Sequence, residues 1–166
     1  MKIGIKGKLY YDTAVRATWG SLSGQVHQGV APATLTEIDQ VKDVVLDLAV
    51  GEAEATTRAG NGWEQFLAGL TSASIEIELT FDPSSTIWQA FRDAFLGRTS
   101  IALAILDGDK ATTGTEGLWA DFTVLKFATP QNAPDKMKTA ISLKPSPLAS
   151  DGTASVPPEH VEVTAT

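Results

Sequence analysis

The chain has 166 residues, of which 43% are apolar and 20% charged, a composition typical of a soluble globular protein with its own core. The net charge of −7 disfavours binding to nucleic acid through phosphate neutralisation and binding to an anionic membrane surface. The sequence has no cysteine, no apolar signal-peptide core and no apolar run near the roughly 18 residues of a transmembrane helix; this excludes disulfides and thiolate metal sites and predicts no membrane association.

The first half of the chain contains a predicted β-hairpin. Residues 41–48 alternate in side-chain character and place Leu46 and Leu48 on one face, which is typical of a half-buried strand. Residues 49–51 offer a turn, and residues 52–58 continue the alternation. We therefore expect two paired strands joined at this turn.

A loop and a further strand are expected next. Residues 59–62 are Ala-Gly-Asn-Gly, whose glycines and asparagine tolerate positive φ and predict a loop. Residues 63–70 are expected to form a short helical turn or an ordered loop. Residues 74–81 give the clearest strand pattern, because apolar residues alternate with Glu76 and Glu78 over the whole run. One side of this strand should face the core, and the glutamates should face water or a polar surface.

A helix is predicted at about residues 86–96. Ser84 or Ser85 is a natural N-cap, and Gly97 can adopt the left-handed conformation that ends a helix. Apolar residues recur at helical spacing and form one stripe, which should lie on the apolar face of a sheet. The residues of this stripe are Ile87, Trp88, Phe91, Ala94 and Phe95.

Strands are predicted again after the helix, at residues 100–106, 118–127 and 136–144. The first run is nearly all apolar and is expected to be buried on both faces, whereas the other two alternate. Together the elements predict a mainly β protein, an antiparallel β-sandwich or partial barrel with one packed α-helix.

Two segments without a regular pattern are expected to form extended arms. Residues 14–35 are rich in small and polar side chains, which indicates a long loop or arm. Residues 146–166 are rich in proline and are expected to form a tail that is flexible or lies along a partner. We expect one domain over residues 1–145, followed by this tail.

The sequence offers little catalytic chemistry. His27 and His160 lie in the two irregular segments without a metal-ligand neighbour, and the Asp-Gly-Asp of residues 107–109 lacks the ligands that follow in a calcium loop. Glu76 and Glu78 are the best candidates for paired acid–base carboxylates, but neighbours on one exposed strand face are expected to be solvated. We therefore expect no catalytic, cofactor-binding or metal-binding residue and no enzyme.

Acidic residues recur on the polar side of the predicted strands. Like charges on adjacent strands repel, and a mixed surface would serve solubility more easily. Either such a face has a purpose, or the strands are not neighbours, or the acidic excess simply reflects an acidic protein. The acidic residues at these positions are Asp43, Asp47, Glu52, Glu54, Glu76 and Glu78.

An ordered series of short motifs resembles the tail tube proteins of long-tailed bacteriophages. The first motifs are V-K-D-V-V-L-D-L at 41–48, G-E-A-E-A-T-T-R at 51–58, N-G-W at 61–63 and L-T-S-A-S-I-E-I-E-L at 70–79. The later motifs are D-A-F at 93–95, D-G-D at 107–109 and G-L-W-A-D-F at 117–122. The resemblance covers roughly residues 38–145 and rests on the order of the motifs.

The resemblance implies a structural protein that forms hexameric rings, which stack into a hollow tube in the phage tail. DNA would pass along the lumen without tight binding, and the six acidic residues would face the lumen and repel the phosphates. Tail tip and terminator proteins are the other expected partners, and the virion is the expected location after synthesis in the bacterial host cytoplasm. Arg58, Trp63 and Phe66 are expected at contacts between subunits, because arginine and aromatic residues are enriched at interface hot spots.

Alternative functions stay open from the sequence. A gene transfer particle would use an equivalent tube, and a head-to-tail joining or tail terminator protein would form one ring on the same fold. An acidic β-sandwich module could bind a ligand such as a carbohydrate, although Trp19 and Trp119 are too scattered for a stacking platform.

Overall fold

The computed structural model describes residues 7–54, 56, 64, 66–129 and 137–164. Within this part the chain forms ten strands and one helix. In chain order they are β1 (Lys8–Asp12), β2 (Ser21–Ser23), β3 (Val26–Gly29), β4 (Thr36–Glu37), β5 (Val41–Glu54), β6 (Phe66–Thr80), α1 (Thr86–Gly97), β7 (Ser100–Leu106), β8 (Glu116–Ala128), β9 (Lys138–Pro145) and β10 (Glu159–Val163).

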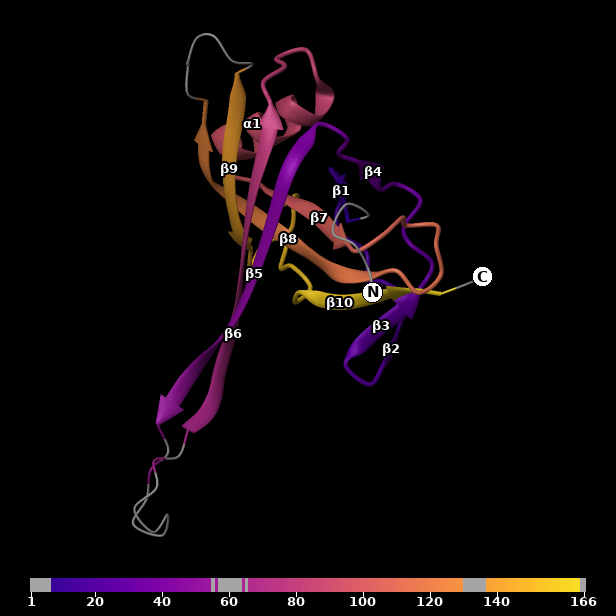
Figure 1. The fold of residues 1–166 in the computed structure, drawn as a ribbon, viewed down its shortest axis with the longest axis vertical. Helices are drawn as coiled ribbons and strands as arrows, with labels where there is room; N and C mark the ends of the chain where they lie inside the picture. Colours follow the sequence, from indigo (N-terminus) through magenta and orange to yellow (C-terminus); the bar gives the residue numbers. More distant parts are fainter. Residues whose placement is uncertain (1–6, 55, 57–63, 65, 130–136, 165–166) are drawn as a thin grey trace.

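The strands form two layers that share β8 (Figure 1). One layer has the order β2-β3-β10-β8-β7-β1-β4, and the other contains β5, β6 and β9. Residues 117–123 of β8 pair with β7 in the first layer, and residues 122–128 pair with β9 in the second. The predicted mainly β fold with one helix is confirmed, and the sheet does not close into a barrel.

The main core lies between the two layers and α1. The alternation of β6 buries Ile75, Ile77 and Leu79, as the sequence predicts. Phe91 of α1 is fully buried against this cluster, and the indole N–H of Trp88 donates a 3.0 Å hydrogen bond to the Thr139 hydroxyl. The amphipathic stripe of the helix therefore packs on the sheet, as expected.

A second core lies on the other side of β7 and β8, and the two segments predicted to be arms cover it. Trp19 is fully buried, and its ring meets that of Trp119 edge-on at a centroid distance of 6.0 Å. The remaining members of this core are Tyr10, Leu35, Ala102, Ala104, Leu106, Val161 and Val163. β7 is therefore buried on both faces, as predicted.

The prediction that residues 14–35 form only a long loop or arm is wrong, because they contain β2 and β3. The prediction for the tail after residue 145 is also wrong in part, since it contains β10, which pairs with β8 and runs parallel to β3. Both segments have strands too short to show an alternation of their own. Their pairing joins residues more than 100 positions apart, such as His27 and Val161.

The predicted range of the helix is confirmed, but its C-terminal end differs from the prediction. α1 continues to Gly97, and the left-handed residue is Arg98, with φ of 54°. Ser85 is the N-cap residue but makes no side-chain capping hydrogen bond. An arginine in this conformation costs roughly 1–2 kcal/mol relative to an ordinary backbone conformation. In the described residues, no helix is long and apolar enough to cross a membrane.

The predicted turn at residues 49–51 is wrong, because β5 runs through it without a break to Glu54. Residues 66–70 likewise belong to β6 and not to a helical turn. Gly51, which suggests the turn in the sequence, instead lies within β5 where this strand pairs with β6. The two strands pair from Val41 opposite Leu79 to Glu54 opposite Phe66.

Candidate assembly surface

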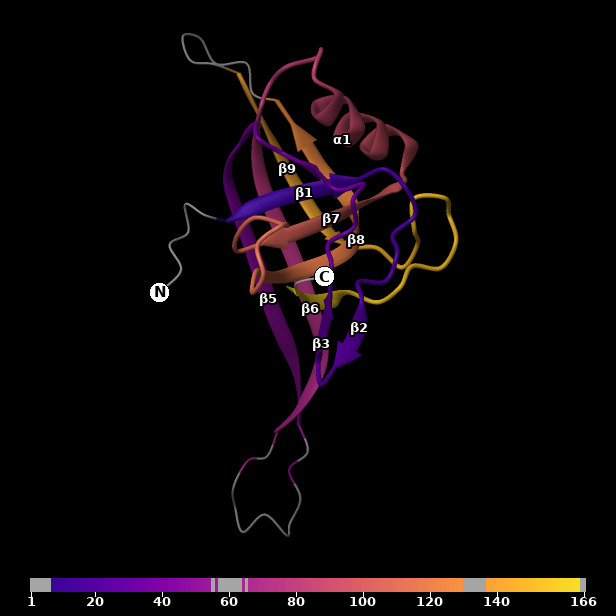
Figure 2. The ribbon, with the colours of Figure 1, turned by 90° about the vertical axis from the view of Figure 1, so that its right-hand side faces the viewer.

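A two-stranded ribbon projects from the body of the molecule (Figures 1 and 2). It consists of residues 47–54 of β5 and residues 66–74 of β6, and we call it the distal ribbon. β9 pairs with β6 only along residues 75–80, so the described part of the chain places no third strand beside the distal ribbon. A two-stranded ribbon alone is marginally stable in water.

Large apolar side chains on the distal ribbon are exposed to solvent. Phe66 is 55% exposed and Leu70 is 90% exposed. Leu48, which the sequence analysis places on the core side, lies on that side of β5 but beyond the core, and it is exposed. The exposed side chains lie on both faces of the ribbon, since Phe66 is on the side of Leu48 and Leu67 is on the other side. Large exposed apolar side chains are typical of a protein–protein contact. Further exposed members are Val50 and Leu67.

A bulge in β6 changes the pairing within the distal ribbon. Gly51 of β5 faces two residues of β6, Gly69 and Leu70. A Cβ atom at Gly69 would lie 2.9 Å from the carbonyl oxygen of Gly51, so the strands approach too closely there for a side chain. The extra residue on β6 leaves the alternation of β5 unbroken through this point.

Four of the six predicted acidic residues share one face. Asp43 lies opposite Glu78, and Glu76 and Asp47 follow on the same side of the β5–β6 pair. Lys138 of β9 forms a 2.9 Å ion pair with Glu78 on this face. We call the side of β5, β6 and β9 that carries these four acids the acidic face.

Lys126 of β8 also lies on the acidic face, since it pairs with Ser142, which in turn pairs with Glu76. The sequence analysis missed both lysines, because it could not place β9 and β8 beside β6. The acidic face is therefore mixed in sign, with acids concentrated on β5 and β6.

The other predicted site residues have different positions. By the alternation of β5, Glu52 and Glu54 lie on the side of Leu48, opposite Asp43 and Asp47. Phe66 pairs with Glu54 at the far end of the described ribbon. Arg58 and Trp63 lie outside the described residues. The structure thus does not bring all six acids onto one face.

The second layer ends in two free strand edges. In the described residues, β5 pairs only with β6, and residues 124–128 of β8 pair only with β9. All neighbouring strands of this layer are antiparallel, so the two edges run in opposite directions. Natural sheets usually block long free edges, and an unblocked edge can add a strand from another chain.

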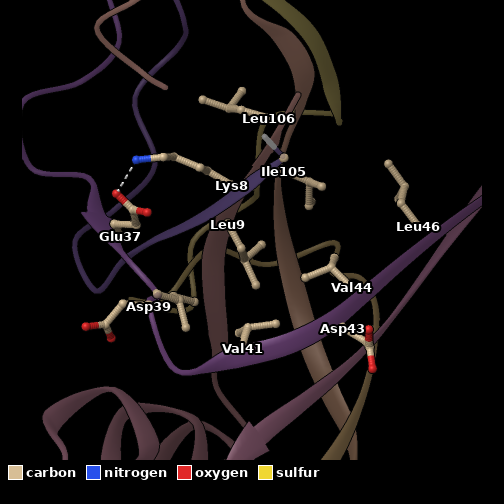
Figure 3. Close-up of a pocket in the computed structure, with 12 residues that line it drawn as sticks. Lys8, Leu9, Glu37, Asp39, Val41, Asp43, Val44, Leu46, Ile105 and Leu106 are labelled. Carbon is tan, nitrogen blue, oxygen red and sulfur yellow. Dashed lines mark hydrogen bonds and ion pairs between the residues drawn. The ribbon is translucent and has the colours of Figure 1, made fainter. Parts of the chain in front are cut away.

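A hollow of about 480 Å³ lies beside the free edge of β5, between β5 and the β1–β4 pair (Figure 3). We call it the edge hollow. Leu9, Val41 and Val44 point into it from its two sides. Asp39 and Asp43 lie on its rim.

At the other end of the edge hollow, Lys8 donates hydrogen bonds of 2.9 Å to Glu37 and to Asp109. These bonds raise the pKa of Lys8 above its ordinary value, so the lysine stays charged and compensates Glu37. Asp39 and Asp43 have no ion-pair partner among the described residues, so the rim beside β5 is negatively charged.

The histidines lie in strands rather than in the expected loops: His27 in β3 and His160 in β10. His160 lies 3.8 Å from Glu116, on the solvent side of the second core. In the part of the chain that the structure describes, no group of three or more His, Cys, Asp or Glu side chains could hold a metal ion.

The sequence matches no protein-family model and no curated protein. A chain from the SPP1 tail tube has a similar structure, with a TM-score of 0.63 and 12% identity over 99% of this chain and 81% of that chain. This chain has the fold of a tail tube protein. A chain from the tail of an empty gene transfer agent particle, a structure with C6 symmetry, gives a TM-score of 0.63 at 15% identity over 90% of this chain and 98% of that chain.

The tail tube fold is also similar to that of a contractile device. A chain from the sheath–tube complex of an extracellular contractile injection system gives a TM-score of 0.54 at 13% identity, over 94% of this chain and 89% of that chain. The three comparisons therefore agree on one overall fold, over 90–99% of this chain.

Proposed function

We propose that this chain is the structural subunit of a phage or phage-derived tail tube, in which hexameric rings stack into a hollow conduit for DNA. The observation that carries the proposal is the exposed apolar distal ribbon, together with two free sheet edges, on the tail tube fold. An isolated subunit would leave all of these surfaces in water. The virion would be its location after synthesis in the host cytoplasm, and tail tip and terminator proteins would be its partners at the tube ends.

The direction of the strands suits a ring. Because the free edges of β5 and of residues 124–128 of β8 run in opposite directions, rotation about an axis along the strands brings them together as antiparallel neighbours. Each subunit would then continue the sheet of the next, and closure of the ring would remove the free edges.

In such a ring the second layer would form the inner wall, and we propose that Asp43, Asp47, Glu76 and Glu78 face the lumen. The negative charge of β5 and β6 would repel the phosphate backbone of DNA, so that the DNA slides without sticking. Glu52 and Glu54 are proposed to face the lumen only where the ribbon twists into the neighbouring ring. Arg58, Trp63 and Phe66 are proposed as contacts between subunits, with the distal ribbon reaching the next ring.

Negative-stain electron microscopy of the purified protein at low and high concentration tests this proposal. Hollow tubes or stacked rings with six-fold symmetry are the expected result. Single rings that never stack would instead indicate a terminator protein. A protein that stays monomeric at high concentration, even with a tail tip complex added as nucleus, would contradict the proposal.

The variant Phe66→Ser is expected to prevent stacking without unfolding the subunit. Phe66 is 55% exposed, so its loss removes little burial from the isolated chain, but it removes an aromatic contact from the proposed interface. We expect the melting temperature to stay within about 2 °C of wild type, because surface substitutions usually change stability by less than 0.5 kcal/mol. Micrographs should show rings or free subunits in place of tubes, and tubes of normal length would contradict the proposed role of this side chain.

The double variant Asp47→Lys/Glu76→Lys is expected to slow DNA passage while the tubes stay intact. Lysines on the inner wall would bind phosphates, and this binding should weaken steeply as salt rises. DNA ejection from particles that carry the variant tube measures the effect. The matched control Asp47→Asn/Glu76→Gln removes the charge without adding a phosphate ligand and should eject DNA faster than the lysine variant; equal rates for the two would contradict a lumen position.

A further inference from the structure

The two lateral edges of the second layer carry different side chains. The edge at β5 holds the edge hollow, with an apolar floor and the negatively charged rim of Asp39 and Asp43. The opposite edge holds a corner where the C-terminal end of α1 meets β8. We call this the helix corner, and its residues are Phe95, Leu96, Arg98 and Leu125.

The helix corner is an exposed apolar surface with a positive charge. Leu96 is 69% exposed, and Leu125 and Phe95 are exposed beside it. Arg98 has no ion-pair partner among the described residues, and it occupies the left-handed position at which glycine is the usual residue. A strained arginine at a position that favours glycine suggests that its side chain has a use outside the subunit.

The helix corner and the edge hollow are both apolar and carry opposite charges. The helix corner carries the exposed Leu96 beside a guanidinium, and the edge hollow is apolar with two carboxylates on its rim; none of these three charges has an ion-pair partner in the described part of the chain. The two surfaces lie at opposite edges of the same sheet (Figure 2, where β5 and the end of α1 are on opposite sides). Two complementary surfaces on one chain give a head-to-tail contact, which closes into a ring when the rotation fits.

We infer that in the assembled ring the helix corner of one copy seats in the edge hollow of the next, with Leu96 in the hollow and Arg98 paired with Asp39 or Asp43. The occupant of the hollow is thus a second copy of this chain. The inference rests on the proposed ring. This side-chain contact would lie outside the paired strand edges. Because its two surfaces differ, neighbouring copies can join only head to tail.

Cross-linking maps this contact directly, because the chain has no cysteine of its own. The double variant Val44→Cys/Leu96→Cys, oxidised in assembled tubes, is expected to give a ladder of covalent oligomers that ends at the ring number. Val44→Cys/Leu22→Cys is the matched control, since Leu22 is exposed to a similar extent, 63% against 69% for Leu96, but lies on β2 in the other layer, and it should give monomers.

The outcomes separate the contact from the proposed tube. Tubes without a cross-linked ladder would overturn the contact and leave the tail tube function standing. A cross-link from Val44→Cys to Ile3→Cys within one chain would assign the hollow to the chain's own N-terminus and would also overturn it. Protein that never assembles under nucleating conditions and gives no ladder would contradict both.

Charge reversal gives an independent readout. Arg98→Asp is expected to reduce the assembled fraction at least ten-fold, and the triple variant Arg98→Asp/Asp39→Arg/Asp43→Arg should recover most of it. Arg92→Asp, a reversal on the same helix, should assemble as wild type. Arg98→Gly relieves the left-handed strain, so it should melt at or above the wild-type temperature and still assemble poorly; normal assembly of this variant would overturn the role of the guanidinium.

Discussion

Arg16→Met is expected to lower the free energy of unfolding by about 3–5 kcal/mol, because it leaves two buried carboxylates without their cation. The guanidinium is fully buried, 3.2 Å from Asp121 and 3.3 Å from Glu159. It also donates hydrogen bonds to the carbonyl oxygens of Val156 and of Pro157. Urea unfolding followed by tryptophan fluorescence measures the loss.

This arginine joins the two segments that cover the second core to the strand between them. Asp121 belongs to β8, whereas Val156 and Glu159 come from the C-terminal segment. If the loss arises from unpaired carboxylates, Arg16→Met/Asp121→Asn/Glu159→Gln should recover part of it, since neutral side chains are easier to leave in this site. Arg92→Met is the control, because its ion pair with Asp93 is exposed and should contribute less than about 1 kcal/mol. Equal losses for Arg16→Met and Arg92→Met would contradict this explanation.

The strongest periodic patterns in the sequence predicted the structure well. The apolar run at Ser100–Leu106 forms β7 with the predicted bounds, and the stripe that includes Phe91 forms α1. β7 lies between the two cores, so its run is apolar on both faces, whereas α1 packs with one face and therefore has one apolar stripe. In both elements an extensive buried surface leaves a pattern that can be read from the sequence.

The predicted arms show where this reasoning stops. β2 has three residues and β3 has four, too few for a period, and both depend on β10 from the far end of the chain. The types of residue in this segment, rather than their periodicity, could have revealed the second core. Trp19 and Arg16 are residues that a solvated loop rarely needs, and the structure buries both.

The sequence predicted which acidic residues share a face within one strand, but not which residues of different strands share a face. Alternation correctly placed Glu76 and Glu78 opposite the buried residues of β6. Gly51 suggested a turn, which would have put Glu52 on the side of Asp47, but β5 continues through Gly51 with the extra residue on β6, so Glu52 lies on the other side. A glycine in a predicted strand can mark a turn or a close approach of two strand backbones. Only the pairing with the partner strand distinguishes these two cases.

Trp19→Ala is expected to lower the free energy of unfolding by about 3–5 kcal/mol, the usual cost of truncating a fully buried aromatic residue. The ring of Trp19 is buried against Trp119, and its indole N–H donates to the Gly29 carbonyl oxygen at 3.3 Å, while the backbone N–H of Trp19 donates to the Glu159 carboxylate at 3.2 Å. Truncation would leave a cavity and remove the indole hydrogen bond to Gly29. Calorimetric unfolding of the free subunit measures the change.

Leu22→Ala in the same segment is the matched control, because its side chain is 63% exposed on β2 and its truncation should change stability by less than about 0.5 kcal/mol. A small effect for both variants would mean that residues 14–35 are dispensable for the fold of the free subunit. A large loss for Trp19→Ala alone would show that this segment belongs to the folded body before any ring forms. The surfaces left for assembly would then be the distal ribbon and the two lateral edges, and not the segments that the sequence suggested as arms.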